Sequence, residues 1–388
     1  MPETFDCIVL GVGGFGSGTL FHLARRGARV LGIERFGVAH DRGSSHGQTR
    51  IIRKAYFEHP DYVPLLHRAY ELWRELERES ERPLLHQVGL FIAGAPECES
   101  VSGTLLAAKL HNLPVEKLDP IEAQRRFPGY RFGDGFQVVF EPDAGYLEVE
   151  NCVAAHCEAA VQCGAALRTG ETVVSWSSDG SQVRVTTDRG EYSAASLVIT
   201  AGSWSERVLT EATSGGAAPP WRDWLHVVRK PVFWFPADAT YDVSRGNPTF
   251  FFETPSGQFY GAPRLDGKTI KVAEHTGGDA VADPLSVDRA QHPDDLLRVR
   301  DFLHAHLPAI RPEPVGHSVC MYTRSPDGHF CIDRLLNRPN VVVGAGFSGH
   351  GFKFTTVLGE ALADLALEGR TDLPVRFLSL ARLGSKRA

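Results

Sequence analysis

The sequence has no paired-cysteine motif, no long apolar run and no signal-like N-terminus. Its seven cysteines are an odd number without Cys-x-x-Cys spacing, so neither a disulfide framework nor a zinc site is expected. No apolar stretch approaches the roughly 18 residues that a membrane-spanning helix needs, and no basic segment followed by an apolar run opens the chain. These absences predict a cytoplasmic protein that contacts no membrane and binds no metal.

Blocks of like charge are absent as well. The 388 residues carry 41 Lys and Arg against 47 Asp and Glu, for a formal net charge of −6 and a pI of about 6.2. Without a basic patch, nucleic acid is not an expected partner. Hydrophobic residues make up 43% of the chain, as in ordinary globular proteins, and the length predicts two or three domain-sized units.

The first fifty residues carry the pattern of a dinucleotide-binding turn. The apolar run Phe5–Leu10 leads into Gly11-Val12-Gly13-Gly14-Phe15-Gly16, and a helix to Arg26 and a second strand, Ala28–Ile33, follow. Gly11 permits a tight turn, Gly13 lets the backbone approach a pyrophosphate, and Gly16 lets helix and strand pack closely. Glu34, 23 positions after Gly11, is placed to accept hydrogen bonds from ribose hydroxyls. The pattern favours a bound dinucleotide over a ligand-free glycine turn, but it does not separate FAD from NAD.

Two more turns of this kind follow later in the chain. The strand Val341–Val343 runs into a glycine-rich segment, 344–353, and then into a helix with one apolar side. Another buried strand, Ser196–Thr200, ends in Ala201-Gly202-Ser203-Trp204, where the backbone can again approach a nucleotide. Because these turns lie far apart in the sequence, they predict one nucleotide-binding domain assembled from distant segments.

The remaining segments predict helices and a largely β second domain. Apolar residues at helical spacing predict helices over 62–80, 101–110 and 293–306, and another that ends the segment 145–160. Short runs between turn residues predict a β-meander over 172–193 and strands over 227–235, 249–253, 258–260 and 269–273. The small residues and prolines of 213–220 are interpreted as a crossing between domains.

Five segments resemble, in the same order, one family of flavoproteins. They are Gly43-Ser44-Ser45-His46-Gly47-Gln48-Thr49-Arg50-Ile51-Ile52-Arg53, Tyr260-Gly261-Ala262-Pro263, Ile270-Lys271-Val272-Ala273-Glu274-His275, Cys320-Met321-Tyr322-Thr323 and Gly346-Phe347-Ser348-Gly349-His350-Gly351-Phe352-Lys353. Together they resemble the monomeric sarcosine oxidase family, which includes N-methyltryptophan oxidase and belongs to the D-amino-acid-oxidase-like flavoproteins. The likeness spans nearly the whole chain, and its last two blocks are specific.

The resemblance implies an α/β fold (α+β overall) with two domains. A Rossmann-like FAD-binding domain is expected from the discontinuous segments 1–85, 145–215 and 316–388. A substrate domain with a mixed, largely antiparallel β-sheet is expected from residues 86–144 and 216–315. The resemblance also implies that the protein is a monomer.

The cofactor implied by the resemblance is FAD, attached covalently through a thioether at Cys320. From its sequence context alone, Cys320 would be interpreted like the other six cysteines, as a buried free thiol. The residues expected around the cofactor are Gly11, Gly13, Gly14, Phe15, Gly16, Glu34, Arg35, Ser44, Thr49, Arg50, Val173, Ala201, Gly202, Trp204, Cys320, Met321, Phe347, Gly349, His350, Gly351, Phe352 and Lys353.

The resemblance also assigns roles in substrate binding and catalysis. Arg53 and Lys353 are expected to bind the substrate carboxylate, which suits a planar guanidinium fork and a compact ammonium. Lys271 is expected to assist the reaction with oxygen, because a fixed cation stabilises superoxide as it forms. His275, Tyr260, Arg50 and Thr49 complete the expected catalytic set, and Tyr260 also belongs to the expected substrate site. Without the resemblance, Arg53 could equally be a site residue or a residue of a surface ion pair, Lys271 would be interpreted as a solvent-facing lysine of a strand, and His275 as merely hydrogen-bonded.

The predicted function is oxidation of a secondary amino acid, N-methylated or cyclic, to an imine with reduction of O2 to H2O2. Alternatives are an amino-acid dehydrogenase that passes electrons to a carrier, a non-catalytic dinucleotide-binding or redox-sensing protein, and an NAD-dependent dehydrogenase. Ala262 and Glu274 stand where sarcosine oxidases more often carry aromatic residues. A roomier or more polar pocket is therefore expected, and the substrate stays open among sarcosine, other N-methyl amino acids, pipecolate and proline.

Overall fold

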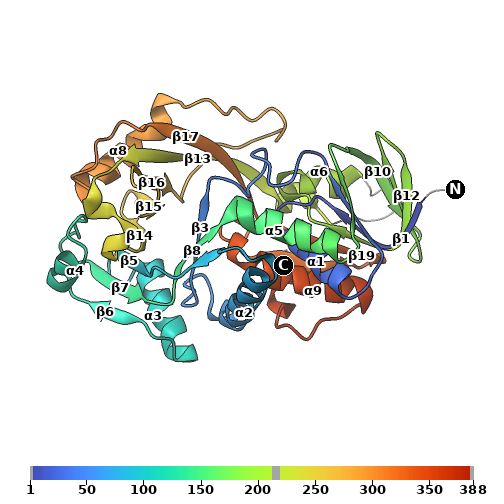
Figure 1. Ribbon diagram of the computed structural model, residues 1–388, viewed down its shortest axis with the longest axis horizontal. Helices are drawn as coiled ribbons and strands as arrows, with labels where there is room; N and C mark the ends of the chain where they lie inside the picture. Colours follow the sequence, from blue (N-terminus) through green and yellow to red (C-terminus); the bar gives the residue numbers. More distant parts are fainter. Residues whose placement is uncertain (1–2, 212–218, 385–388) are drawn as a thin grey trace.

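Two large β-sheets, joined by a small third sheet, organise the chain (Figure 1). The computed structural model describes residues 3–211 and 219–384. Most of the crossing predicted at 213–220 therefore lies outside the described residues. Among the described residues, no helix combines the length and the apolar character that crossing a membrane requires.

The first sheet gathers strands from both ends of the chain. Its strand order is β10-β11-β12-β1-β2-β9, with β19 beside β12 and β18 beside β19. The bounds are β1 Glu3–Leu10, β2 Val30–Glu34, β9 Ala166–Thr169, β10 Val173–Ser178, β11 Val183–Thr187, β12 Glu191–Ile199, β18 Cys331–Leu335 and β19 Arg338–Ala345. Strands β2, β1, β12 and β19 run parallel, so the turns that follow them meet at one edge of the sheet. This confirms that the glycine-rich turns predicted from distant segments belong together.

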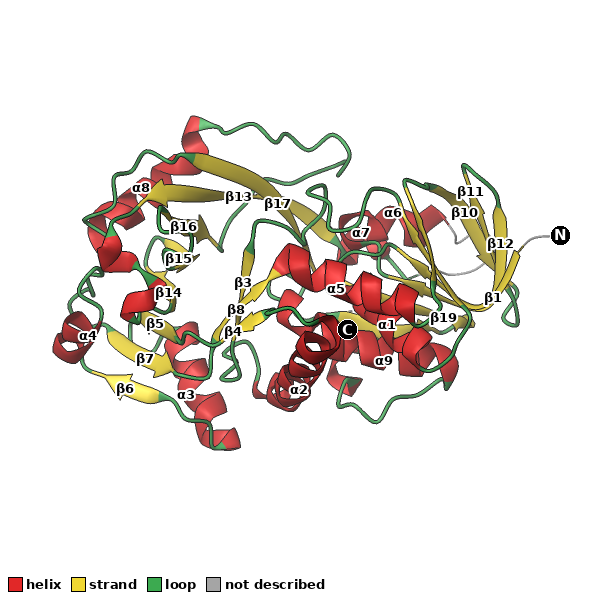
Figure 2. Cartoon of the chain, viewed as in Figure 1, coloured by secondary structure: helices red, strands yellow, loops and turns green. Residues whose placement is uncertain are grey.

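The second sheet is mixed and largely antiparallel, as predicted (Figure 2). Its strand order is β17-β13-β16-β15-β14-β5-β7-β6, and β14 with β5 is a parallel pair. The bounds are β5 Leu90–Gly94, β6 Glu116–Leu118, β7 Gln137–Glu141, β13 His226–Pro236, β14 Thr249–Thr254, β15 Gly257–Ala262, β16 Thr269–Glu274 and β17 Gly316–Arg324. Strand β17, which carries Cys320, was not predicted as a strand, and it lies at the edge of this second sheet.

The small third sheet lies between the other two (Figure 2). It consists of β3 Thr49–Ile52, β8 Gly145–Glu148 and β4 Leu85–His86, in the order β3-β8-β4. The segment predicted over 145–160 thus begins as β8 and continues as helix α5, Val149–Gln162. Strand β3 begins with Thr49 and Arg50, so it brings two predicted site residues to the junction of the large sheets.

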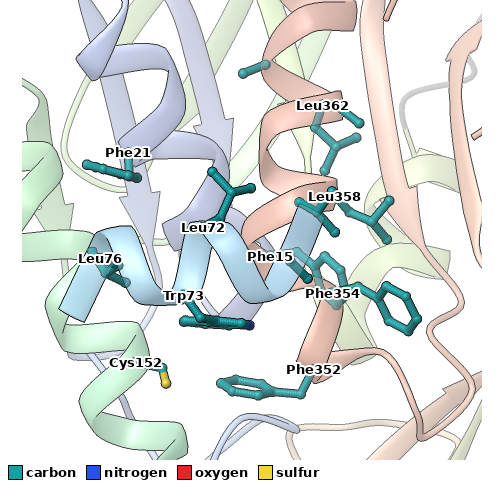
Figure 3. Packing of buried hydrophobic residues seen from close by; sticks show 14 of the residues in the cluster. Phe15, Phe21, Leu72, Trp73, Leu76, Cys152, Phe352, Phe354, Leu358 and Leu362 are labelled. Atoms are coloured by element: carbon teal, nitrogen blue, oxygen red, sulfur yellow. The ribbon is translucent and has the colours of Figure 1, made fainter. Parts of the chain in front are cut away.

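Four helices cover one face of the first sheet and enclose its core (Figure 3). They are α1 Gly14–Arg25, α2 Val63–Ser80, α5 and α9 Thr355–Leu367. Trp73 of α2 is fully buried, stacks near Phe352 and donates an indole N–H to the main-chain oxygen of Lys353 at 3.1 Å. The core therefore fixes the loop that carries a predicted substrate-binding lysine.

The other helices have these bounds: α3 Glu99–His111, α4 Pro120–Arg126, α6 Ser205–Glu211, α7 Trp221–Trp224, α8 Pro293–His306 and α10 Ala381–Gly384. Short 3-10 helices are η1 Pro60–Tyr62, η2 Gly202–Trp204, η3 Ala239–Tyr241, η4 Val243–Arg245, η5 Phe352–Phe354 and η6 Arg376–Leu378. The helices predicted over 62–80, 101–110 and 293–306 are confirmed as α2, α3 and α8.

Candidate active site

A cavity of about 440 Å³ opens where the turns after β1, β12 and β19 meet. Its walls include seventeen of the residues predicted to bind the cofactor: Gly11, Gly13, Gly14, Phe15, Glu34, Arg35, Ser44, Arg50, Val173, Ala201, Gly202, Trp204, Met321, Phe347, Gly349, Gly351 and Phe352. His350 and Lys353 line a second, adjoining cavity. Gly16, Thr49 and Cys320 line neither, although the contacts described below place all three beside lining residues.

The three glycines of the first turn meet the demands predicted for a pyrophosphate site. Gly11 has a φ of +84°, which favours glycine. A Cβ at Gly16 would lie 1.9 Å from the main-chain oxygen of Gly11, so only glycine lets the helix start this close to the strand. A Cβ at Gly13 would meet nothing within 4 Å, because that position faces the open cavity. The turn thus leaves free space at the N-terminus of α1, where main-chain N–H groups attract phosphate.

Glu34 ends β2 at the same cavity. Its carboxylate accepts hydrogen bonds from the main-chain N–H groups of Val12 (2.8 Å) and Phe36 (3.0 Å), and the His40 ring lies 3.4 Å away. Burial opposes ionisation, but these hydrogen bonds, led by that of His40, lower the pKa of Glu34. The group is therefore an acceptor at neutral pH, as a partner of ribose hydroxyls must be. The cavity, the glycine turn and this acid fit a dinucleotide such as FAD.

Cys320 lies where strands from two sheets meet, and it differs from the other buried cysteines. Its Sγ accepts a hydrogen bond from the guanidinium of Arg50 at 3.3 Å and lies 3.8 Å from His46 Nδ1. Burial would raise the pKa of Cys320, but the Arg50 guanidinium and the His46 ring outweigh it and lower the pKa to about 6. In contrast, burial raises the pKa of Cys7 and of Cys157 to about 12. Cys320 is thus poised as a thiolate, the nucleophilic form of cysteine.

The second cavity, of about 60 Å³, adjoins the first and shares Arg50, Tyr322, Gly349 and Phe352 with it. Its lining residues are Arg50, Ile51, Arg53, Phe57, Glu58, Leu90, Phe251, Tyr260, His275, Tyr322, Gly349, His350, Phe352 and Lys353. Five residues predicted for substrate binding or catalysis therefore come together here, namely Arg50, Arg53, Lys353, Tyr260 and His275.

Two cations and one carboxylate form the charged end of the second cavity. Arg53 is buried, donates to Glu58 at 2.6 Å and to the main-chain oxygen of Ala55 at 3.0 Å, and lies over the Phe57 ring at 4.0 Å. Lys353 donates to the main-chain oxygen of His350 at 2.7 Å. Burial alone would raise the pKa of Glu58. The positive charge of Arg53, followed by the effects of His350 and Lys353, outweighs burial and lowers this pKa to about 2. With Arg53 and Lys353 charged, this group carries one more positive than negative charge.

Burial makes both lysines of the site weak bases. It lowers the pKa of Lys353 to about 7, with Arg53 adding to the shift. Burial also lowers the pKa of Lys271 to about 7, and the positive charge of Arg50 adds to this shift. An anion bound beside either lysine would restore its charged form, since an opposite charge raises the pKa of an ammonium group.

Lys271 contacts the β3 loop instead of lining either cavity. Its Nζ donates to the main-chain oxygens of Gly47 (2.6 Å) and Thr49 (2.9 Å) and lies 3.2 Å from Thr49 Oγ1. The carboxylate of Glu150 holds the same loop by accepting from the N–H of Gly47 at 2.7 Å. Lys271 is thus fixed beside Thr49, next to Arg50, which lines both cavities.

His275, Tyr260 and Tyr322 form one wall of the second cavity, and Tyr322 also lines the first. His275 Nδ1 lies 3.4 Å from the Tyr322 hydroxyl, and the rings of His275 and Tyr260 lie edge to face at 6.3 Å. Burial, and after it the charge of Lys230, lowers the pKa of His275 to about 3. The imidazole is therefore neutral and can accept or donate a hydrogen bond.

Sequence reasoning missed several residues of the site. Glu58, which neutralises part of the charge of Arg53, carried no motif signal, and its role depends on the turn that brings it back to β3. His46 and Tyr322 lie inside the quoted motifs but were not named as site residues. The two departures from the family pattern, Ala262 and Glu274, do not line the second cavity, and Glu274 pairs with Arg298 at 2.7 Å.

This geometry fits a dinucleotide-binding protein in which the larger cavity adjoins a small, charged one. Comparison with known proteins gives the same class, since residues 6–365 match the model of a family described as FAD dependent oxidoreductase. The chain is 39% identical to a monomeric sarcosine oxidase of Streptomyces avermitilis, over 99% of each chain. It is 34% identical to an N-methyl-L-tryptophan oxidase of Escherichia coli, over 97% of this chain and 99% of that one. The solved structure of NikD, described as an unusual amino acid oxidase essential for nikkomycin biosynthesis, superposes with a TM-score of 0.85 and 28% identity over 97% of both chains.

The chain therefore belongs to the FAD-dependent oxidoreductases and, within them, to the family of the monomeric sarcosine oxidases and N-methyl-L-tryptophan oxidases. The predicted family and fold class are confirmed, and FAD is the cofactor that this family uses.

Gly13→Ala should separate folding from cofactor binding. Its Cβ meets no protein atom within 4 Å, so the free energy of unfolding of the flavin-free protein should change by less than about 0.5 kcal/mol. The methyl group would occupy the space of the phosphates, so the ratio of flavin to protein should fall below about half of the wild-type ratio. Absorbance at flavin and protein wavelengths measures that ratio. Gly190→Ala is the matched control, because its Cβ also meets only a distant atom, at 3.9 Å; equal flavin contents would contradict the assignment.

Proposed function

We propose that the protein is an FAD-dependent oxidase of secondary amino acids, N-alkylated or cyclic, which forms an imine and reduces O2 to H2O2. One observation carries the proposal: the buried Arg53–Glu58–Lys353 group lies in a small cavity that shares four lining residues with the cofactor cavity. The relatives named as sarcosine and N-methyl-L-tryptophan oxidases support the substrate class.

The charged end of the small cavity suits one carboxylate. Arg53 offers the planar fork that a carboxylate prefers, and Lys353 adds a point charge. Because Glu58 already takes one contact of Arg53, the excess of one positive charge leaves a place for a single additional anion. A substrate carboxylate here would place the rest of a small amino acid against Tyr260, His275 and Tyr322.

FAD, held by residues of the larger cavity such as Gly13 and Glu34, would supply a hydride acceptor for the carbon next to the substrate nitrogen. The surrounding residues must therefore hold the amine without its extra proton, because an ammonium cannot supply the electrons for the carbon–nitrogen double bond. His275 is neutral at physiological pH and can hydrogen-bond the amine. The cations around the cavity disfavour a further positive charge, which lowers the pKa of a bound amine.

Lys271 and Cys320 have proposed roles on the cofactor side. Lys271, fixed by main-chain oxygens of the β3 loop, would stabilise the negative charge that develops on oxygen during its reduction. Cys320 would form the thioether: its S–H bond and one C–H bond of the 8-methyl group of the flavin would break, one S–C bond would form, and the two electrons would pass to the flavin ring and then to O2, which would be reduced to H2O2. Its lowered pKa and its contacts with Arg50 and His46 support this proposal.

Three broader expectations remain proposals. The division into segments 1–85, 145–215 and 316–388 for the cofactor and 86–144 and 216–315 for the substrate is supported by the two large sheets, although β17 pairs with the second one. A cytoplasmic location is supported by the free thiols of all seven cysteines. A monomer is supported by the names of the sarcosine oxidase relatives.

The function is tested by mixing the purified protein with a panel of sarcosine, N-methyl-L-tryptophan, pipecolate and proline. At least one should bleach the flavin anaerobically and release peroxide in air. Arg53→Gln should weaken binding of that substrate by about 100-fold, since a buried charge pair is lost. The exposed Arg125→Gln is the control. Bleaching without peroxide would instead support a dehydrogenase, and no bleaching by any member of the panel would refute the proposal.

Lys271→Met should slow the reaction of the reduced flavin with oxygen by about 100-fold, because a preorganised cation is removed. Anaerobic reduction of the flavin should slow much less. Stopped-flow absorbance measures both half-reactions separately. The exposed Lys268→Met, just before the same strand, should behave like the wild type. Equal slowing of the two half-reactions would argue against the assigned role.

Cys320→Ser should abolish covalent attachment. After acid precipitation, the flavin of the wild-type protein should stay with the pellet, and that of the variant should appear in the supernatant. Absorbance of the two fractions gives the result. Cys163→Ser, at an exposed cysteine, is the control and should retain the flavin in the pellet. Release of the flavin from the wild-type protein would show that Cys320 forms no bond with it.

A further inference from the structure

A third buried lysine, Lys230, lies on the face of the second sheet that carries the site. In the register of β13 and β17, Lys230 is opposite Cys320, so their side chains share a face. On the other side of β13, Val232 is opposite Ala273 of β16. Beyond that pair the β13–β16 ladder ends, and Lys230 lies near enough to His275 for its charge to act on the imidazole. Lys230 is 3% exposed, and none of the roles proposed above uses it.

The contacts of Lys230 lead to two residues of the substrate cavity. Its Nζ donates to the main-chain oxygen of Thr276 at 2.6 Å and lies 5.6 Å from the centroid of the Tyr322 ring. Tyr322 in turn meets His275 at 3.4 Å. Lys230 does not line the cavity itself, so it lies one layer behind the wall that faces the substrate nitrogen.

The charges around this group come from several elements. Those that act on Lys230 are Glu274 of β16, Asp279 of the following loop, Arg324 of β17 and Arg298 of α8. Those that act on His275, besides Lys230, are His350, Glu58 and Arg324. Glu274 is bound to Arg298. Burial lowers the pKa of Lys230 to about 8, so the side chain is a cation at neutral pH.

We propose that Lys230 is a positioning residue that acts through His275 and Tyr322 to exclude a second proton from the substrate nitrogen. Its fixed charge adds to burial in keeping the imidazole neutral and makes the cavity less favourable to an ammonium than to an amine. The inference deepens the proposed function, because it concerns the amine of the same secondary amino acid. Lys230 thereby sets the lowest pH at which the bound substrate is ready for oxidation.

The test measures the limiting rate of anaerobic flavin reduction across pH for the wild type, Lys230→Gln and Lys230→Arg. In Lys230→Gln the acidic midpoint should rise by about one pH unit, the usual scale of such shifts, with an unchanged plateau at high pH. Lys230→Arg keeps the charge and should keep the midpoint. Lys117→Gln, at an exposed lysine of β6, is the control. An unmoved midpoint in Lys230→Gln, or a rate lowered equally at every pH, would overturn the proposal.

Binding provides a second measurement that needs no turnover. At pH 7, Lys230→Gln should bind a secondary amino acid about tenfold more tightly, because the ammonium form is no longer repelled. The analogue in which a thioether sulfur replaces the amine nitrogen should bind to the variant and to the wild-type protein with the same dissociation constant. Perturbation of the flavin spectrum gives both dissociation constants. Equal changes in the two dissociation constants would refute the role of Lys230. Failure of the proposed function would be distinguishable, because the wild-type protein would then bind the amino acid without reduction of the flavin.

Discussion

The burial of positive charge is the constraint on which the site depends. Arg50, Arg53, Lys271 and Lys353 all lie between the two large sheets, where a cation without partners is strongly disfavoured. Main-chain oxygens and one carboxylate hold them in place, but these partners do not restore the pKa of either lysine to its ordinary value. A bound anion would favour the charged form of both lysines, and the proposed carboxylate substrate would be such an anion.

The fold supplies this arrangement by bringing distant segments to one edge. Parallel pairing of β1, β12 and β19 places their turns side by side, and the short β3 carries Thr49 and Arg50 into the gap between the sheets. The hydrogen bond from Trp73 to the main-chain oxygen of Lys353 joins the hydrophobic core to the charged cavity. Packing of the hydrophobic core beside the first sheet thus sets the position of Lys353, which is proposed to bind the substrate carboxylate.

The sequence predicted the parts of this site that have strong local rules. Gly11, Gly13 and Gly16 stand in a strand–turn–helix context, and the structure gives each the freedom or the close approach that glycine provides. The roles of Arg53, Lys271 and Cys320 came from the family resemblance, because nothing local separates a buried cation or thiolate from an ordinary one. Glu58 was not predicted because its pairing with Arg53 depends on the path of the loop after β3, and no repeating sequence pattern indicates that path. Strand β17 was missed because Cys320-Met321-Tyr322-Thr323 is short and mixed, and because its partners in β13 lie 90 to 96 positions earlier in the sequence.

The placement of Cys320 has a consequence for how the molecule holds together. The thiol belongs to the second sheet, whereas the glycine turn that receives the phosphates belongs to the first. A thioether at this position would make the cofactor a crosslink between the two large sheets, held at points that lie more than three hundred residues apart in the sequence. Separation of the two sheets would then require either rupture of a covalent bond or release of the phosphates. The same attachments would therefore hold the sheets together and retain the cofactor.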